Sequence, residues 1–176
     1  HAVGEHHQRH RPPPHRRGGQ VELGQHLALP FAVDPFEVAD FIRGRRGPVP
    51  LVVFSHGMGG SREGYSYLGA NWAARGYASL HLQHAGSDSR LWSGNPFDMV
   101  SRLQSAASEA EAVNRVRDLG FALDEVLADP QLAGAINAGR ILAAGHSYGA
   151  NTALLAAGAV FARQQGTLSY RDSRIF

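Results

Sequence analysis

A serine near the C-terminal end of the chain lies in the pattern G-x-S-x-G, at Gly145-His146-Ser147-Tyr148-Gly149. A serine hydroxyl at its ordinary pKa is a weak nucleophile, and it becomes reactive when a base takes its proton and an acid orients that base. In this pattern the serine sits on a sharp turn, and the flanking glycines leave room for a close approach of the backbone. We therefore predict that Ser147 is a catalytic nucleophile and that Gly145 and Gly149 are structural residues of the turn.

The segments on either side of Ser147 fit the elements that such a turn needs. RILAAGH at 140–146 predicts a strand that leads into the serine, and the small apolar residues of 149–162 predict a helix that approaches the sheet closely. The N-terminus of that helix would direct its free N–H groups and its dipole toward the serine oxygen.

A second glycine-rich motif, SHGMGG at 55–60, follows the apolar run at 51–54. An H-G-x-G loop at the end of such a strand supplies a backbone N–H to an oxyanion hole, whose other N–H belongs to the residue after the nucleophile. Taken alone, the motif is better explained as an ordinary glycine loop between a strand and a helix. Two motifs in the right order, each at the end of a predicted strand, favour the catalytic interpretation.

Predicted strands and helices alternate along the chain. The strand at 51–54 is followed by an amphipathic helix within 61–76, which Gly76 would end, and by a strand at 77–84. A helix from about residue 98 to residue 127 then leads to the strand before Ser147. The apolar stripe predicted for this long helix consists of Val113, Val116, Phe121, Leu123 and Leu127. The alternation is typical of the α/β class, with a mostly parallel sheet and crossover helices.

Composition separates an N-terminal tail from one domain. Residues 1–20 hold five His, four Arg and three consecutive Pro, which predicts a disordered tail, and residues 21–176 form the predicted domain, with short edge strands within 21–42. The whole chain has 17 Lys and Arg against 15 Asp and Glu, and the excess lies in the tail. The domain therefore lacks the basic face that a nucleic-acid partner would need. Since the most apolar run, 153–162, is shorter than a membrane span, it predicts a buried helix.

Two long segments together resemble the α/β-hydrolase superfamily: PLVVFSHGMGGSREGYSYLGANWAARGYASLHLQHAGSD and GRILAAGHSYGANTALLAAGAV. Within it the chain is similar to predicted dienelactone hydrolases and platelet-activating factor acetylhydrolases, over about residues 47–176. The resemblance implies that Ser147 is the nucleophile and that the backbone N–H groups of Met58 and Tyr148 form the oxyanion hole. Dienelactone hydrolases of this fold use cysteine at the turn, whereas this chain has no cysteine. Hydrolysis of a small carboxylic ester, without a metal or organic cofactor, is therefore the expected activity.

The base and the acid of a serine triad are not evident in the chain. This fold places the acid and then the histidine after the serine, but no histidine follows Ser147, and Asp172 is the one acid that does. Four upstream residues near the ends of predicted strands are further candidates: His56, His84, His146 and Asp88. A loop-shaping role for His56, a polar loop contact for His84 and a capping role for Asp88 are more economical. We therefore expect a C-terminally truncated, incomplete α/β-hydrolase domain that is inactive by itself.

Two hypotheses of different classes follow. The first is a serine esterase that forms an acyl-enzyme on Ser147, and the second is a non-catalytic hydrolase-like protein that binds a ligand or a partner. The missing histidine is the feature that supports the second hypothesis. Leu91 and Trp92 could line a substrate pocket or serve ordinary packing, and the sequence does not specify the acyl group, the oligomeric state or the cellular compartment.

Overall fold

Three parallel strands form the central sheet of the computed structural model, which describes residues 47–130, 132, 134–163 and 166–176. The strands are β1 (Val49–Ser55), β2 (Ala78–Leu82) and β3 (Ile136–Gly145), in the order β2-β1-β3. Every residue of the run 51–54 is at most 4% exposed. A central parallel strand is covered on both faces, which explains why this run is continuously apolar.

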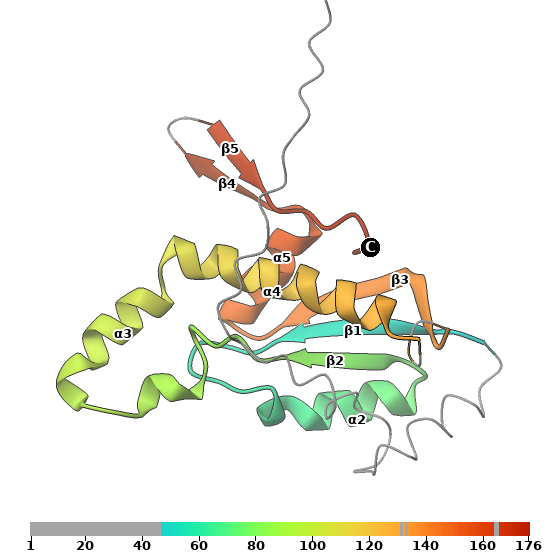
Figure 1. Ribbon diagram of the computed structural model, residues 1–176, viewed down its shortest axis with the longest axis horizontal. Coiled ribbons are helices and arrows are strands. Elements are labelled where there is room, and N and C mark those ends of the chain that lie inside the picture. Colours follow the sequence, from blue (N-terminus) through green and yellow to red (C-terminus); the bar gives the residue numbers. More distant parts are fainter. Residues whose placement is uncertain (1–46, 131, 133, 164–165) are drawn as a thin grey trace, which may run out of the picture.

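Helices connect the strands and cover the sheet on both faces (Figure 1). The α-helices are α2 (Ser66–Ala74), α3 (Met99–Ala106), α4 (Glu109–Ala128) and α5 (Tyr148–Ala157). Three short 3-10 helices precede or interrupt them: η1 (Glu63–Tyr65), η2 (Ser89–Trp92) and η3 (Pro96–Asp98). Gly76, which follows the C-cap of α2, has a φ of 92° and ends that helix as its sequence position suggests.

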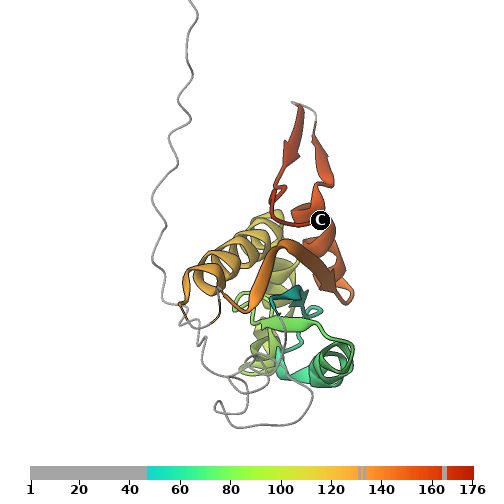
Figure 2. The ribbon, with the colours of Figure 1, turned by 90° about the vertical axis from the view of Figure 1, so that its right-hand side faces the viewer.

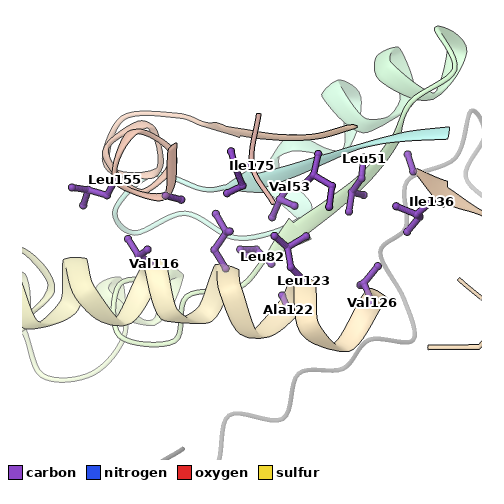
Figure 3. Packing of buried hydrophobic residues seen from close by; sticks show 14 residues of the cluster. Leu51, Val53, Leu82, Val116, Ala122, Leu123, Val126, Ile136, Leu155 and Ile175 are labelled. Carbon is purple, nitrogen blue, oxygen red and sulfur yellow. The ribbon is translucent and has the colours of Figure 1, made fainter. Parts of the chain in front are cut away.

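The main core lies between the sheet and one helical layer. Figure 3 shows side chains of β1, β2 and β3 packed against α4 and α5, among them Val53, Leu123 and Leu155. The opposite face of β1 carries Phe54, whose ring lies 5.9 Å from that of Trp72 in α2. Accordingly, α2 and α4 lie on opposite sides of the sheet in Figure 2. Because helices pack on both faces of the sheet, the positions of the strand ends are well defined, and the two glycine motifs lie at these ends.

A two-stranded antiparallel hairpin, β4 (Val160–Arg163) and β5 (Gly166–Ser169), extends away from the sheet (Figure 1). The chain then returns to the sheet, where Ile175 forms a parallel bridge with Ile141 of β3 and is 4% exposed. The free edge of β3 is therefore covered at this point by the last residues.

The structure corrects three details of the predicted elements. The helix predicted from about residue 98 to 127 is two helices, because Ser108 caps α4 through a hydrogen bond from the Glu111 N–H and breaks the run. Phe121 is 46% exposed and does not belong to the apolar stripe. The stripe that does pack is Ala112, Val116, Leu119, Ala122, Leu123 and Val126. The run 153–162 is not one helix, since α5 ends at Ala157 and β4 begins at Val160.

The α/β class with a parallel sheet and crossover helices is confirmed. The predicted tail at 1–20 and the predicted edge strands within 21–42 lie outside the described residues. Among the helices of the described residues, none combines the length and the apolar character needed to cross a membrane.

Candidate active site

Ser147 lies at an exposed, sharp turn between β3 and α5. Its φ of 53° and ψ of −116° place it in a region that non-glycine residues avoid, and it is the one such residue with positive φ among those that the structure describes. A Cβ on Gly145 would lie 2.2 Å from the backbone carbon of Gly149. Gly145 is therefore required by close contact across the turn, and the backbone strain at Ser147 is maintained by the packing around it.

The glycine loop after β1 lies directly beside this turn. Ser55 and Gly145 are register partners on neighbouring parallel strands, so both strands end at the same edge. A Cβ on Gly57 would lie 3.5 Å from Ser147 Cβ, and a Cβ on Gly149 would lie 1.8 Å from the Ser55 carbonyl oxygen. The two motifs, which are about 90 residues apart in the sequence, thus meet at one site.

The Met58 and Tyr148 N–H groups are the two predicted donors of the oxyanion hole. Tyr148 is the first residue of α5, and the first N–H groups of a helix have no acceptor within the helix. In the loop, the Gly59 N–H donates to the Ser87 carbonyl and the Gly60 N–H donates to the Gly57 carbonyl. The Met58 and Tyr148 N–H groups donate to no backbone carbonyl of the described residues.

His56 and His84 are both fully buried and are held in defined tautomers. The His84 backbone N–H donates to His56 Nε2 (3.1 Å), so His56 Nδ1 carries the proton and donates to the Gly57 carbonyl (2.7 Å). His84 Nδ1 donates to Asp118 Oδ2 (2.9 Å), and its Nε2 accepts from Ser55 Oγ (3.0 Å). The Nε2 atom of His84 is therefore occupied by a hydrogen bond with Ser55, a serine with no exposed surface. His56 stabilises the conformation of the loop beside Ser147.

His146 and Asp88, which could also act as a base or an acid, are engaged in hydrogen bonds as well. His146 is exposed, and its Nδ1 lies 2.8 Å from the Tyr65 hydroxyl. Asp88 caps η2 by accepting from the Arg90 N–H. Burial alone would raise the pKa of Asp88, but hydrogen bonds from Arg90 and Gln83 outweigh it and lower that pKa. Among the described residues, neither group is hydrogen-bonded to Ser147.

Asp172 lies against α4 rather than at the turn. Its carboxylate accepts from Arg174 Nη2 (2.6 Å), and that arginine also binds Asp124 and the Gly120 carbonyl of α4. The hydrogen bond from Arg174 lowers the pKa of Asp172. The carboxylate is therefore part of an ion pair that joins the C-terminal segment to α4.

The buried histidines predict a loss of stability in mild acid. Burial lowers the pKa of His56 from 6.5 to about 4 and also lowers that of His84, against the opposing effect of Asp118. The titratable groups that act on the pKa of His56 are His84 and Arg115, which lower it, and Asp88, which raises it. Because the unfolded chain takes up a proton below pH 6.5 and the folded chain does not, the stabilising effect of the neutral ring is lost as the pH falls toward 4. Between pH 7 and pH 5 we expect the free energy of unfolding to decrease by about 2 kcal/mol or more.

Urea unfolding at the two pH values tests this expectation. Equal unfolding midpoints at both pH values would show that the buried rings do not resist protonation.

One buried charge at this site was not recognised in the sequence. Arg115 has no exposed surface, although it lies on α4 within the apolar stripe, three residues after Ala112 and four before Leu119. An arginine on the buried face of an amphipathic helix was the available signal, because such a charge needs several hydrogen-bonding partners.

The two candidate pocket residues, Leu91 and Trp92, differ in exposure to solvent. Leu91 is 6% exposed and packs in the protein interior, whereas Trp92 is 56% exposed. The indole N–H of Trp92 donates to the Gly59 carbonyl (2.8 Å), and a Cβ on Gly59 would lie 2.4 Å from that ring. Trp92 therefore lies against the glycine loop with an exposed face.

The parallel sheet, its crossover helices and the strand-to-helix turn define the α/β-hydrolase fold class. A family model described as platelet-activating factor acetylhydrolase, isoform II, matches residues 30–93. This match spans β1, α2 and β2 with the glycine loop, and over these residues the chain is similar to that family.

One solved structure with similarity to this chain is the ferulic acid esterase from Streptomyces cinnamoneus. The two chains are 33% identical, with a TM-score of 0.48, over 61% of this chain and 32% of the esterase chain. This chain therefore spans about a third of the length of that esterase. The comparison with curated proteins found no match.

Proposed function

We propose that the complete protein is a serine hydrolase that cleaves carboxylic esters through an acyl-enzyme on Ser147. The observation that carries the proposal is the exposed, strained Ser147 (φ 53°) in contact with the glycine loop after β1. Backbone strain of this kind costs about 1–3 kcal/mol and persists where the surrounding structure enforces it, which is common at sites of chemistry. The match to an acetylhydrolase family model supports the same function.

In this mechanism the oxygen of Ser147 attacks the ester carbonyl carbon as its proton passes to a general base. The N–H groups of Met58 and Tyr148 stabilise the negative charge on the carbonyl oxygen, and the dipole of α5 adds to this effect. The C–O bond to the alcohol then breaks, and the alcohol leaves with the proton. Water attacks the acyl-enzyme in the same way, which releases the carboxylic acid and restores the serine.

We assign the general base and its acid to residues outside the described part of the chain. The described histidines around the turn are engaged elsewhere. His56 binds the Gly57 carbonyl, and His84 binds Ser55 and Asp118. His146 Nδ1 lies 2.8 Å from the Tyr65 hydroxyl. In the order of this fold, the acid and the histidine follow the serine. The proposal therefore assigns the role of general base to none of the described histidines.

A fluorophosphonate probe tests the proposal, because it phosphonylates serines that are activated as nucleophiles. We expect it to label the complete protein at Ser147, identified by mass spectrometry of the modified peptide. The family description names an acetylhydrolase and the solved neighbour is a ferulic acid esterase. The same protein is therefore assayed with an acetyl ester and a feruloyl ester.

The variant Ser105→Ala, which removes an exposed serine of α3, is the control and should be labelled like the wild type. A complete protein that is folded, unlabelled and inactive on both esters would contradict the proposal. That result would favour the second hypothesis, a hydrolase-like protein that binds a ligand without chemistry.

A further inference from the structure

We propose that Arg115 is the positioning residue that holds both halves of the oxyanion hole in place. This inference rests on the proposed function, since it concerns the same site. Arg115 itself has no exposed surface and therefore acts through other groups, not on the substrate.

The guanidinium of Arg115 binds the loop that carries Met58. Its Nη2 donates to the His56 carbonyl in a short hydrogen bond, and its Nη1 donates to Ser87 Oγ (2.6 Å). The carbonyl of the same Ser87 accepts from the Gly59 N–H (2.8 Å). The loop is thus held by Arg115 on both sides of Met58. On the N-terminal side the arginine binds the His56 carbonyl directly, and on the C-terminal side it acts through Ser87, which binds Gly59.

The same guanidinium binds the start of α5, which carries the second N–H donor. Its Nε donates to Thr152 Oγ1 (3.0 Å), and that hydroxyl in turn donates to the Tyr148 carbonyl (3.2 Å). The centre of the guanidinium also lies 4.7 Å from the centroid of the Tyr148 ring, in a cation–π contact. One side chain therefore connects Tyr148 with the loop of Met58.

The composition of the loop explains why an external anchor matters. Three of the four residues at 57–60 are glycine, which gives the backbone many accessible conformations. An oxyanion hole accelerates a reaction only if its donors are already in place when charge develops. Hydrogen bonds from a charged donor to the loop supply the rigidity that the sequence of the loop does not.

The charge of Arg115 is retained in this buried position. Burial lowers its pKa to about 10, so it stays protonated at neutral pH, and interactions with Tyr148, Glu111 and Asp118 oppose that lowering. The Glu111 carboxylate is 2.8 Å from Ser87 Oγ, whose proton it accepts. The Ser87 hydroxyl thus bridges the arginine and a buried carboxylate.

The test compares two variants. Arg115→Met removes all the hydrogen bonds of the guanidinium, and Arg115→Lys keeps the positive charge but not the planar group whose N–H donors reach several acceptors at once. The concentration of active sites is measured by fluorophosphonate titration, so that kcat is calculated only for correctly folded molecules. For Arg115→Met we expect kcat per titrated site to fall roughly 100-fold, the loss typical of a displaced oxyanion donor, while KM changes little. For Arg115→Lys we expect a smaller loss in the same direction.

A trifluoromethyl ketone reports on the oxyanion hole itself, because it binds the serine as a charged hemiketal. Its inhibition constant should rise by the same factor as kcat falls. Thr152→Val, a variant of equal shape that removes one anchoring hydroxyl, should lower kcat about fivefold, and it keeps the proposal testable if Arg115→Met does not fold.

Arg174→Met is the matched control, since Arg174 also binds α4, by two hydrogen bonds, but lies away from the turn. It should lower the stability and leave kcat per titrated site unchanged. Wild-type kcat and inhibitor binding in folded Arg115 variants, with the wild type labelled at Ser147, would overturn the positioning role alone. A wild type that is not labelled would overturn the proposed function, and the positioning role with it.

Discussion

Replacing Ser147 by alanine is expected to abolish ester hydrolysis by the complete protein. Removing the nucleophile of a serine hydrolase lowers kcat by roughly 10⁴-fold or more, because the base and the oxyanion hole act on an oxygen that is no longer present. The exposed side chain of Ser147 makes no hydrogen bond within the described residues that the folded state would miss. The stability should therefore stay within about 0.5 kcal/mol of the wild type.

The measurement is kcat/KM on p-nitrophenyl acetate, with the urea unfolding midpoint recorded for the same samples. Ser105→Ala, at an exposed position of α3, should keep the wild-type value of both quantities. A Ser147→Ala protein that turns over the ester at the wild-type rate would remove this serine from the mechanism.

Replacing Gly149 by alanine is expected to produce the largest loss of stability at the site. The new Cβ would lie 1.8 Å from the Ser55 carbonyl oxygen and 2.8 Å from that of His56. Both atoms belong to the backbone, so no rotation of a side chain relieves the contact, and α5 must move away from β1. A forced shift of packed elements costs about 1–3 kcal/mol and sometimes more. We expect a loss of about 3 kcal/mol or more in the free energy of unfolding.

The same displacement separates Tyr148 from the glycine loop, so the folded fraction should also lose activity. Urea unfolding and kcat per titrated site measure the two effects. Gly64→Ala in η1 is the matched control, because the nearest atom to its new Cβ is Ser61 Oγ at 3.8 Å. It should change stability by less than about 0.5 kcal/mol. A Gly149→Ala protein with the wild-type midpoint would show that β1 and α5 are not in this close contact.

The sequence was sufficient to predict those features that depend on local patterns. The apolar run at 51–54 predicts a strand covered on both faces, and all four residues are buried. Gly76 ends α2 in a conformation with positive φ. The two glycine motifs follow strands, and parallel strands end at a common edge, so their meeting in space follows from the order of the elements.

Periodicity alone gave a less accurate account of the long helical region. The spacing of apolar residues did not reveal the break at Ser108, where one hydroxyl caps a new helix. It also assigned Phe121 to the buried stripe. In the structure the neighbouring Ala122 faces the core instead, and the ring of Phe121 is 46% exposed. The rotation of a helix on a sheet is decided by the side chains that it meets, and these come from distant segments.

What the sequence determined is the pair of glycine motifs and the strand-to-helix turns on which they lie, since both depend on neighbours within a few positions. Only the tertiary structure decided which buried polar groups form hydrogen bonds with one another. His84 binds Ser55 and Asp118, and Arg115 binds the carbonyl of His56, across separations of 29 to 59 residues. The physical reason is that a buried polar group must find its partner in space, and the crossover of the helices, not the order of the chain, determines which partners lie within reach.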